Sequence, residues 1–281
     1  MRADINYSRI IDSDEARAAQ AAADAAPKQP SAEIDISRFY ITQHCDRYTD
    51  ENHEVWRTMY ARRMATLHRQ ASNVFLAGME AIGLPSDRVP KVADINANLA
   101  RMTGWQSRPV PGYLPAKAFF ACLAHREFPT TITIRPKEMM DYLPEPDIFH
   151  DIFGHVPLHA DPVFAEFLQT YGQAALHCED PWHVERLGRL FWFTVEFGLI
   201  REDGRLKLYG SGLISSDGES KFALDSDDVD RRPFDLDRVC DTPFEIDHYQ
   251  PILYVLESFE QLRDAMNSYA ERVLSEAGVA V

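Results

Sequence analysis

The sequence has few cysteines, no long hydrophobic run and no cluster of basic residues. Its cysteines are scattered through the chain, at Cys45, Cys122, Cys178 and Cys240. Because none belongs to a Cys-x-x-Cys pair, nothing suggests a zinc or dithiol redox site, and we expect reduced thiols. No apolar stretch approaches the roughly 20 residues that cross a bilayer, and charged residues interrupt the start of the chain. We therefore expect a cytoplasmic protein without a membrane partner.

Positive charge is also scarce, since 44 acidic residues outnumber 29 basic ones and the net charge is −15. No stretch gathers Lys and Arg into a stripe that would neutralise phosphates, which argues against nucleic acid as a partner. The middle of the chain has no linker rich in Gly, Ser or Pro, and no repeat is evident. With 45% hydrophobic residues over 281 positions, the chain can bury a sizeable core as one domain.

The beginning of the chain differs from the rest, because residues 1–35 carry few large apolar side chains. An Ala-rich run and a Pro-Lys-Gln-Pro segment contribute little to a core, so we expect a mobile N-terminal arm with at most a transient helix. Residues 36–281 are expected to form one domain, and any catalytic site belongs to it.

Helical patterns dominate this domain. Thr49 is a suitable N-cap before two acidic residues, and apolar residues then recur at helical spacing up to Leu67. The same signs predict further helices at Ser72–Ile82, Asp94–Met102, Pro162–Ala175, Val184–Ile200 and about Phe259–Leu274. Patterns typical of strands occur at Thr130–Ile134 and Leu206–Tyr209. We therefore predict a mainly α fold, a single domain of packed helices with short β-strands.

Two histidines lie five residues apart in the segment Phe149-His150-Asp151-Ile152-Phe153-Gly154-His155-Val156-Pro157. On an unbroken α-helix this spacing rotates the second side chain by roughly 140° from the first, so the two could not share one ion. We therefore predict a break, in which Gly154 supplies a left-handed turn and Pro157 prevents continuation. His150 would then lie in the last helical turn and His155 just beyond it, facing one point.

A third candidate ligand, Glu196, is enclosed by the largely apolar stretches 190–195 and 197–200. A carboxylate buried there needs a partner, and a metal ion is the strongest one. Two histidines and one carboxylate on one face hold iron(II) in oxygenases and leave positions open for substrate and oxygen. The set His150, His155 and Glu196 therefore predicts a catalytic non-haem iron(II) site.

Other interpretations of these residues stay open. A histidine near a helix end is more often a capping or surface group than a ligand, and Glu196 could pair with Arg189. A zinc hydrolase would need His-Glu-x-x-His, whereas this chain has a longer spacing and Asp151 after the first histidine. A non-enzymatic helical module with a structural metal is a further alternative, and it predicts a closed site of four ligands.

Four blocks of sequence point to a known family. They are Thr103-Gly104-Trp105 with Val110-Pro111-Gly112; Pro144-Glu145-Pro146-Asp147 through His155-Val156-Pro157; Trp192-Phe193-Thr194-Val195-Glu196-Phe197-Gly198-Leu199; and Tyr209-Gly210 through Leu213-Ile214-Ser215-Ser216 with Glu219. By the order and spacing of these blocks, the chain from about Thr49 to Phe259 resembles the pterin-dependent aromatic amino acid hydroxylases, most closely the short bacterial phenylalanine hydroxylases.

The resemblance implies iron(II) bound by the three ligands named above, and tetrahydrobiopterin or a related tetrahydropterin as cosubstrate. Phe119 would stack on the pterin ring, and Gly112, Leu114 and Asp151 would line the same pocket. Phe191 lies where relatives usually have a tyrosine near the pterin and the metal. Alternatively, Phe119 is an ordinary core residue.

The resemblance also implies the residues that bind the amino acid substrate. Arg135 would bind its carboxylate, a task that suits a planar bidentate donor. The residues that would enclose the ring are Tyr142, Pro146, Trp192 and Phe197. Ser215 and Ser216 would support the metal ligands and the substrate backbone. Alternatively, Phe197 belongs to the core, and Arg135 pairs with Asp141 or Glu138.

The implied reaction is hydroxylation of L-phenylalanine to L-tyrosine with O2. Trp192 favours phenylalanine, because tryptophan enzymes tend to carry a smaller aromatic residue there. Hydroxylation to meta-tyrosine, or of tryptophan, is an alternative, since Phe191 and residues 133–136 depart from the usual pattern. No heptad repeat for tetramerisation is evident near the end of the chain, so we expect a monomer.

Overall fold

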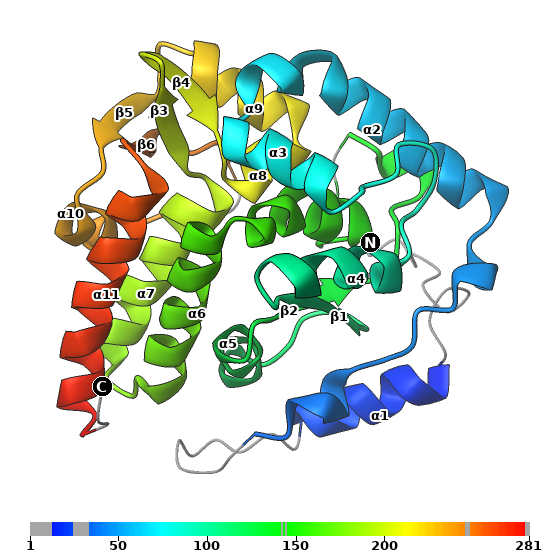
Figure 1. Cartoon of the computed structure of the whole chain (residues 1–281), viewed down its shortest axis with the longest axis horizontal. Helices are drawn as coiled ribbons and strands as arrows, with labels where there is room; N and C mark the ends of the chain where they lie inside the picture. The colour runs from blue at the N-terminus through cyan, green and yellow to red at the C-terminus, as the bar shows by residue number, and fades with distance from the viewer. Residues whose placement is uncertain (1–12, 25–33, 142, 144, 245–247, 279–281) are drawn as a thin grey trace.

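The structure, a computed structural model, describes residues 13–24, 34–141, 143, 145–244 and 248–278. Helices predominate, and a small sheet lies at one end of the molecule (Figure 1). The α-helices are α1 (Ser13–Asp24), α2 (Asp50–Gln70), α3 (Asn73–Ala81), α4 (Val92–Met102), α5 (Ala116–Ala124), α6 (Pro162–His177), α7 (Pro181–Phe191), α8 (Ser211–Ser215), α9 (Asp217–Asp225), α10 (Leu236–Asp241) and α11 (Phe259–Glu276). The predicted mainly α fold with short strands is confirmed. Over the described ranges, no helix is long and apolar enough to span a bilayer.

The strands form two small sheets. In the first, β1 (Gln106–Val110) runs parallel to β2 (Glu127–Thr131). The second has the order β4-β3-β6-β5 and consists of β3 (Leu199–Glu202), β4 (Arg205–Leu208), β5 (Asp230–Pro233) and β6 (Ile252–Leu256). Within it, β3 pairs antiparallel with β4 and parallel with β6, so the sheet is mixed.

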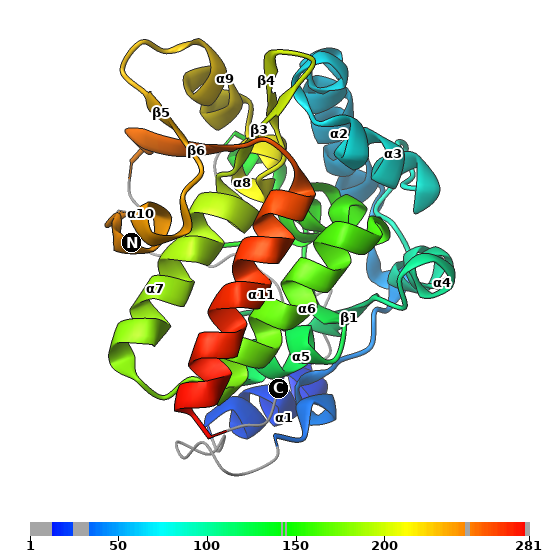
Figure 2. The same cartoon turned by 60° about the vertical axis from the view of Figure 1, so that its left-hand side comes forward.

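Three long helices, α6, α7 and α11, run side by side and form one wall of the molecule (Figure 2). Their inner faces contribute fully buried apolar residues such as Phe164, Leu187 and Met266. The same core cluster extends to Phe149 and Phe153, whose rings stack with centroids 4.5 Å apart. The wall therefore gives the centre of the molecule a continuous apolar support.

The predicted helix starts agree with the observed caps. Thr49 accepts a hydrogen bond from the Asn52 amide, and Asn52 returns one to the Thr49 amide, which is a capping box for α2. Ser72 and Ser258 cap α3 and α11 in the same way, each accepting from a backbone amide three residues on. Gly83 follows α3 with a φ of +67°, a conformation that suits glycine.

One predicted strand has different ends in the structure. The strand expected at Thr130–Ile134 is β2, which begins earlier and ends at Thr131. Beyond that point the Thr133 carbonyl accepts a hydrogen bond from the Ile148 amide at 2.7 Å, so the backbone pairs with the start of the next helical segment. The sequence patterns indicated neither β1 nor α5, and they did not indicate β5 or β6 either.

The helix predicted over Val184–Ile200 is interrupted. α7 ends at Phe191, a π-helical segment, η7, covers Trp192–Glu196, and the last residues of the range belong to β3. The Phe197 amide donates to the Trp192 carbonyl at 2.9 Å, and this bond joins residues five apart as in a π-helix. A single helical period therefore does not describe this stretch.

The N-terminal arm predicted over residues 1–35 lies partly outside the described residues, and its mobility stays a prediction. The described part includes α1, in which Ala19 and Ala22 are buried. Ala19 clusters with Ile41 and Ile132, whereas Ala22 clusters with Phe39 on the following segment. Small side chains therefore let α1 lie close to the domain.

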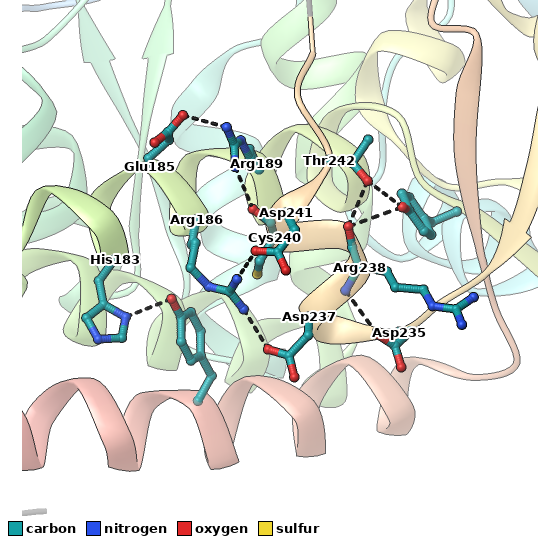
Figure 3. A network of polar contacts seen from close by, with 12 residues as sticks. His183, Glu185, Arg186, Arg189, Asp235, Asp237, Arg238, Cys240, Asp241 and Thr242 are labelled. Atoms are coloured by element: carbon teal, nitrogen blue, oxygen red, sulfur yellow. Dashed lines mark hydrogen bonds and ion pairs between the residues drawn. The ribbon is translucent and has the colours of Figure 1, made fainter.

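A polar network joins α7, α10 and α11 (Figure 3). The buried Arg186 of α7 donates to Asp237 at 2.6 Å and to Asp241, both on α10. His183 of α7 lies 2.9 Å from the hydroxyl of Tyr269 on α11. We call these five residues the α7–α10–α11 clamp. It holds α7 in place just before the chain enters η7.

Candidate functional site

The three predicted ligands come from two π-helical segments. His150 and His155 lie on η5 (Phe149–His155), and Glu196 is the last residue of η7. Hydrogen bonds in a π-helix join residues five apart, so side chains at that spacing project from the same side. The spacing of the two histidines therefore suits this helix type, whereas an α-helix would separate them.

The predicted break at Gly154 is wrong. Gly154 has no positive φ, and η5 passes through it to His155. Pro157 does not end the helical backbone either. It lies at the start of the 3-10 helix η6 (Val156–Ala160), where the N–H that proline lacks would have no helical partner. Gly154 instead permits close packing, since a Cβ there would lie 3.1 Å from the carbonyl oxygen of Ser211.

The ligand atoms converge on one point. The Nε2 atoms of His150 and His155 are 3.2 Å apart, and Oε1 of Glu196 lies 3.3 Å from the His155 Nε2. Oε2 of Glu196 lies 3.7 Å from the His150 Nε2. These distances are close to the edge of about 3 Å expected for an octahedron with bonds of about 2.1 Å. The donor set fits a single divalent cation.

The protonation states also suit a cation. Burial lowers the pKa of His150 to about 4, although the neighbouring Glu196 carboxylate acts in the opposite direction. Burial by itself would raise the pKa of Glu196, but His155, His150 and the Ser211 hydroxyl bring it down to about 2. At neutral pH the site therefore offers a neutral His150 imidazole and an ionised carboxylate.

Two serines of α8 contact the side chains of two metal ligands. The Ser211 hydroxyl donates to Oε2 of Glu196 at 2.7 Å, and Ser215 Oγ lies 3.0 Å from Nδ1 of His150. A proton on Nδ1 leaves Nε2 free to bind metal, which is how hydrogen bonds to the other ring nitrogen orient ligand histidines. Ser211 was missed by the sequence analysis, although its position between two glycines marks a close approach. Ser216, by contrast, caps α9, where its hydroxyl accepts a hydrogen bond from the Glu219 amide.

A cavity of about 230 Å³ opens onto the ligands. Its lining includes all five predicted pterin residues, Gly112, Leu114, Phe119, Asp151 and Phe191. The predicted substrate residue Pro146 lines it as well, as do all three metal ligands. The rings of Phe119 and Phe191 meet edge to face, with centroids 5.7 Å apart. The structure thus brings the predicted pterin residues together on one side of the metal centre.

Asp151 is the one buried carboxylate that the sequence analysis assigned to this pocket. Burial raises its pKa to about 7, although His155 and Thr131 act against the rise. The backbone amide and the hydroxyl of Thr131 both donate to Oδ2 of Asp151, each at 2.7 Å. Oδ1 is left for a donor in the pocket.

Arg135 forms a buried ion pair, but with neither of the two alternatives considered from the sequence. Its Nε and Nη2 atoms each lie 2.8 Å from one oxygen of Asp147. Asp147 also accepts from the His150 amide at 3.0 Å, so the pair is connected to the start of η5. Asp141 pairs with Arg62 instead, at 3.3 Å. Arg135 lies outside the lining of the cavity.

Trp192 and Phe197 pack against each other, with ring centroids 4.7 Å apart, and neither lines the cavity. Phe244, which the sequence analysis missed, stacks on Trp192 at 4.5 Å and 15°. Tyr142 lies outside the described residues. The alternative in which Arg189 pairs with Glu196 is wrong, because Arg189 pairs with Glu185 at 2.5 Å.

Comparison with known proteins identifies the family. The sequence model of the biopterin-dependent aromatic amino acid hydroxylase family matches residues 39–280. A phenylalanine-4-hydroxylase from Ralstonia nicotianae is 46% identical over 227 residues, which cover 81% of this chain and 72% of the relative. The phenylalanine-4-hydroxylase from Chromobacterium violaceum is 42% identical over 231 residues, which cover 82% and 78%. A rat tyrosine 3-monooxygenase is 39% identical over 80% of this chain, but over only 46% of its own length.

Solved structures agree with these sequence matches. The C. violaceum enzyme with iron(III) and 7,8-dihydrobiopterin superimposes with a TM-score of 0.81 at 39% identity, covering 92% of both chains. The same enzyme bound to cobalt gives a TM-score of 0.82 at 38% identity, covering 93% of this chain and 92% of the other. The fold, the converging ligands and the extent of the match lead to one conclusion: the chain belongs to the biopterin-dependent aromatic amino acid hydroxylase family.

Proposed function

We propose that this protein hydroxylates the ring of L-phenylalanine to L-tyrosine, using O2, iron(II) and a tetrahydropterin. The observation that carries the proposal is the convergence of His150, His155 and Glu196 at a cavity lined by the predicted pterin residues. The bacterial relatives described above are phenylalanine-4-hydroxylases, and the C. violaceum enzyme binds iron and dihydrobiopterin. Both observations support the same substrate and cofactors here.

The metal site is of the open kind. Among the described residues, the cluster contains three candidate ligands, and a cavity adjoins it. A structural metal site would be closed by four ligands, so this arrangement argues against the non-enzymatic alternative. Two histidines and a carboxylate on one face suit iron(II) that must also accept oxygen or substrate.

The cavity suits a flat, polar-edged ring system. Phe119 lines it with an aromatic ring, and Gly112 and Leu114, from the loop before α5, line it as well. Oδ1 of Asp151 is available to accept a hydrogen bond from an N–H on the ring edge, because Thr131 occupies Oδ2. When bound beside it, iron(II) and the reduced pterin supply the electrons that activate O2 for transfer to the aromatic ring.

The remaining protein groups act by placement. Arg135 would bind the substrate carboxylate, and its pair with Asp147 fixes the guanidinium plane for that role. Trp192, which packs against both Phe197 and Phe244, would limit the size of the ring that enters. Pro146 lines the cavity together with the predicted pterin residues. Apolar walls exclude water from the reacting atoms.

A direct assay tests the proposal. Purified protein is supplied with iron(II), a tetrahydropterin, O2 and each aromatic amino acid in turn, and products are identified by mass and retention time. We expect tyrosine from phenylalanine. Formation of meta-tyrosine or hydroxytryptophan instead would overturn the assigned product while preserving the reaction class. Absence of any product, with iron shown to be bound, would overturn the catalytic assignment.

We further propose that the protein is a cytoplasmic monomer. No helix of the described residues is long and apolar enough to cross a membrane, and α11 buries its apolar side chains, among them Leu262, Met266 and Tyr269, in the core of the same chain. Light scattering after size exclusion should give a mass near 32.1 kDa. A mass twice or four times as large would contradict the monomer.

A further inference from the structure

The short helix α8 contacts two of the three metal ligands. Ser211 at its start donates to Glu196, and Ser215 at its end meets His150, at 2.7 and 3.0 Å respectively. A helix of five residues is far too short to be stable by itself, so tertiary contacts must hold it. The position of α8 therefore decides how these two ligands are oriented.

The side of α8 that faces the metal has little room for movement. A Cβ at Gly210 would lie 2.5 Å from the carbonyl oxygen of Glu196, and one at Gly212 would lie 3.1 Å from it. The main chain around α8 thus packs directly on the segment that carries the carboxylate. A shift of α8 would be transmitted to Glu196 because no side chain lies between them to absorb it.

On another side, α8 is held by an arginine from a distant helix. Arg63 of α2 is 3% exposed, and its Nε donates to the carbonyl oxygen of Ile214 at 2.7 Å. Nη2 donates to the carbonyl of Leu213 at 3.4 Å, and Nη1 reaches Asp217 at 3.4 Å. The two carbonyls belong to the last turn of α8, where a helix leaves its carbonyl groups without intrahelical partners.

The residue type explains this arrangement. Burial lowers the pKa of Arg63 to about 10, with Asp217 acting in the opposite direction, so the side chain stays charged at neutral pH. The rigid guanidinium fork can reach two successive carbonyls and a carboxylate together, which the single ammonium of lysine does less well. An apolar residue would fill the same space at lower desolvation cost, but it would leave the carbonyls unpaired.

We propose that Arg63 is a positioning residue for the metal centre: by holding the main chain of α8, it fixes Ser211 and Ser215 and hence the orientation of Glu196 and His150. The proposal rests on the proposed function only in that His150, His155 and Glu196 bind a metal. It concerns a residue about 90 positions before the first ligand in the sequence. No motif in the sequence indicated it.

The test compares Arg63→Met with Arg63→Lys and uses Arg62→Met as the matched control. Arg62 is the neighbouring residue on α2, but its side chain is 54% exposed, and among the described residues its ion pair is with the exposed Asp141. Cobalt(II) is the probe, and its dissociation constant and visible spectrum are measured on metal-free protein, together with the unfolding midpoint. We expect Arg63→Met to weaken cobalt binding by about 10- to 100-fold and to alter the spectrum. Arg63→Lys should restore part of the affinity, and Arg62→Met should change neither.

The contrary result is equally definite. If Arg63→Met lowers only the unfolding midpoint, while the cobalt dissociation constant and spectrum match those of the unaltered protein, Arg63 is merely structural. Should Arg63→Met fail to fold, Arg63→Lys is combined with Ser211→Ala and Ser215→Ala. Because contacts that act in series are not additive, Arg63→Lys should then cost less affinity in the double-alanine background than in the unaltered chain. Equal costs in both backgrounds would overturn the proposal.

These results are separable from those of the proposed function. If cobalt binding depends on Arg63 but the protein hydroxylates none of the aromatic amino acids, the proposed function is wrong and the positioning role of Arg63 stands. If the protein hydroxylates phenylalanine but Arg63→Met leaves cobalt binding unchanged, the proposed function stands and the positioning role is wrong.

Discussion

The metal centre and the α7–α10–α11 clamp are polar clusters built around buried side chains and connected through α7, yet they are completed in different ways. In the clamp, the cation Arg186 lies between two carboxylates of α10, so the protein supplies both signs of charge. At the metal centre, His150, His155 and Glu196 all present lone pairs to one point. The clamp therefore stabilises the fold by itself, whereas the metal centre is a set of donors for a cation from outside.

The contacts that orient the charged and metal-binding groups also differ between the two regions. Ser215 contacts the ring nitrogen of His150 that faces away from the common point, and Ser211 donates to Oε2 of Glu196, so each serine orients one ligand. In the clamp, His183 and Tyr269 bind each other, with the Arg186 guanidinium carbon 5.8 Å from the Tyr269 ring centroid. Substitutions in the two regions should therefore separate activity from stability.

The largest expected effect is that of Glu196→Ala. Loss of the carboxylate should abolish turnover and weaken iron(II) binding by at least about 100-fold, because two imidazoles alone hold the ion poorly. Iron binding is measured by titration of the metal-free protein, and activity by product formation. Glu185→Ala, an exposed carboxylate on α7, is the control and should retain both. Full activity of Glu196→Ala would show that the carboxylate is misassigned.

The next effect is stabilisation by the metal. A ligand at 100 times its dissociation constant stabilises the folded state by about 2.7 kcal/mol, so saturating iron(II) or cobalt(II) should raise the unfolding midpoint by several degrees. Calorimetry of the metal-free and metal-loaded protein measures the shift. Glu196→Ala should show little or no shift, while a clamp variant should show the full one. A shift of the same size in Glu196→Ala would place the stabilising metal elsewhere.

Arg186→Met should have the converse effect. It removes the cation of the clamp, but Asp237 and Asp241 have side chains 68% and 66% exposed and can be rehydrated. We therefore expect a loss of only about 1–2 kcal/mol in the free energy of unfolding, measured by urea titration. Cobalt affinity should not change. A tenfold loss of affinity would show that the two regions are coupled through α7.

The smallest effect concerns Glu219 on α9, the helix that directly follows α8 in the chain. Burial raises the pKa of Glu219 to about 7. The folded chain then holds a proton that the unfolded chain releases from about pH 4.5 upwards, so the free energy of unfolding should fall as pH rises from about 4.5 to 7. Glu219→Gln should flatten this part of the urea-derived stability profile; because Glu219 is only partly buried, solvent screening should reduce the effect to less than about 1 kcal/mol. An unchanged slope would contradict the assignment.

Much of the fold could be predicted from local sequence because its signals are local. The cap at Thr49 needs only Asn52, three residues on, and the apolar spacing that follows specifies one face of α2. The three metal ligands could also be identified, since two histidines and a buried carboxylate form a recognisable donor set. The four family blocks then indicated which pocket lies beside them.

The π-helical segments could not be predicted in this way. The residues of η5 and η7 have no propensity that separates a π-helix from an α-helix, so the sequence pattern predicted a broken helix end at Gly154 and a continuous helix through Glu196. What selects the wider turn is packing against other segments, such as Ser211 on Gly154. That contact joins residues far apart in the sequence.

By itself, then, the sequence determined the helical fold, the identity of the ligands and the family, because caps, hydrophobic periods and donor types are properties of short segments. Only the tertiary structure decided that the ligands converge from two π-helical segments, that Arg135 pairs with Asp147, and that Arg63 holds α8. These features depend on hydrogen bonds and close approaches across the core. Their energy exists only once the chain has brought distant residues within a few ångströms of each other.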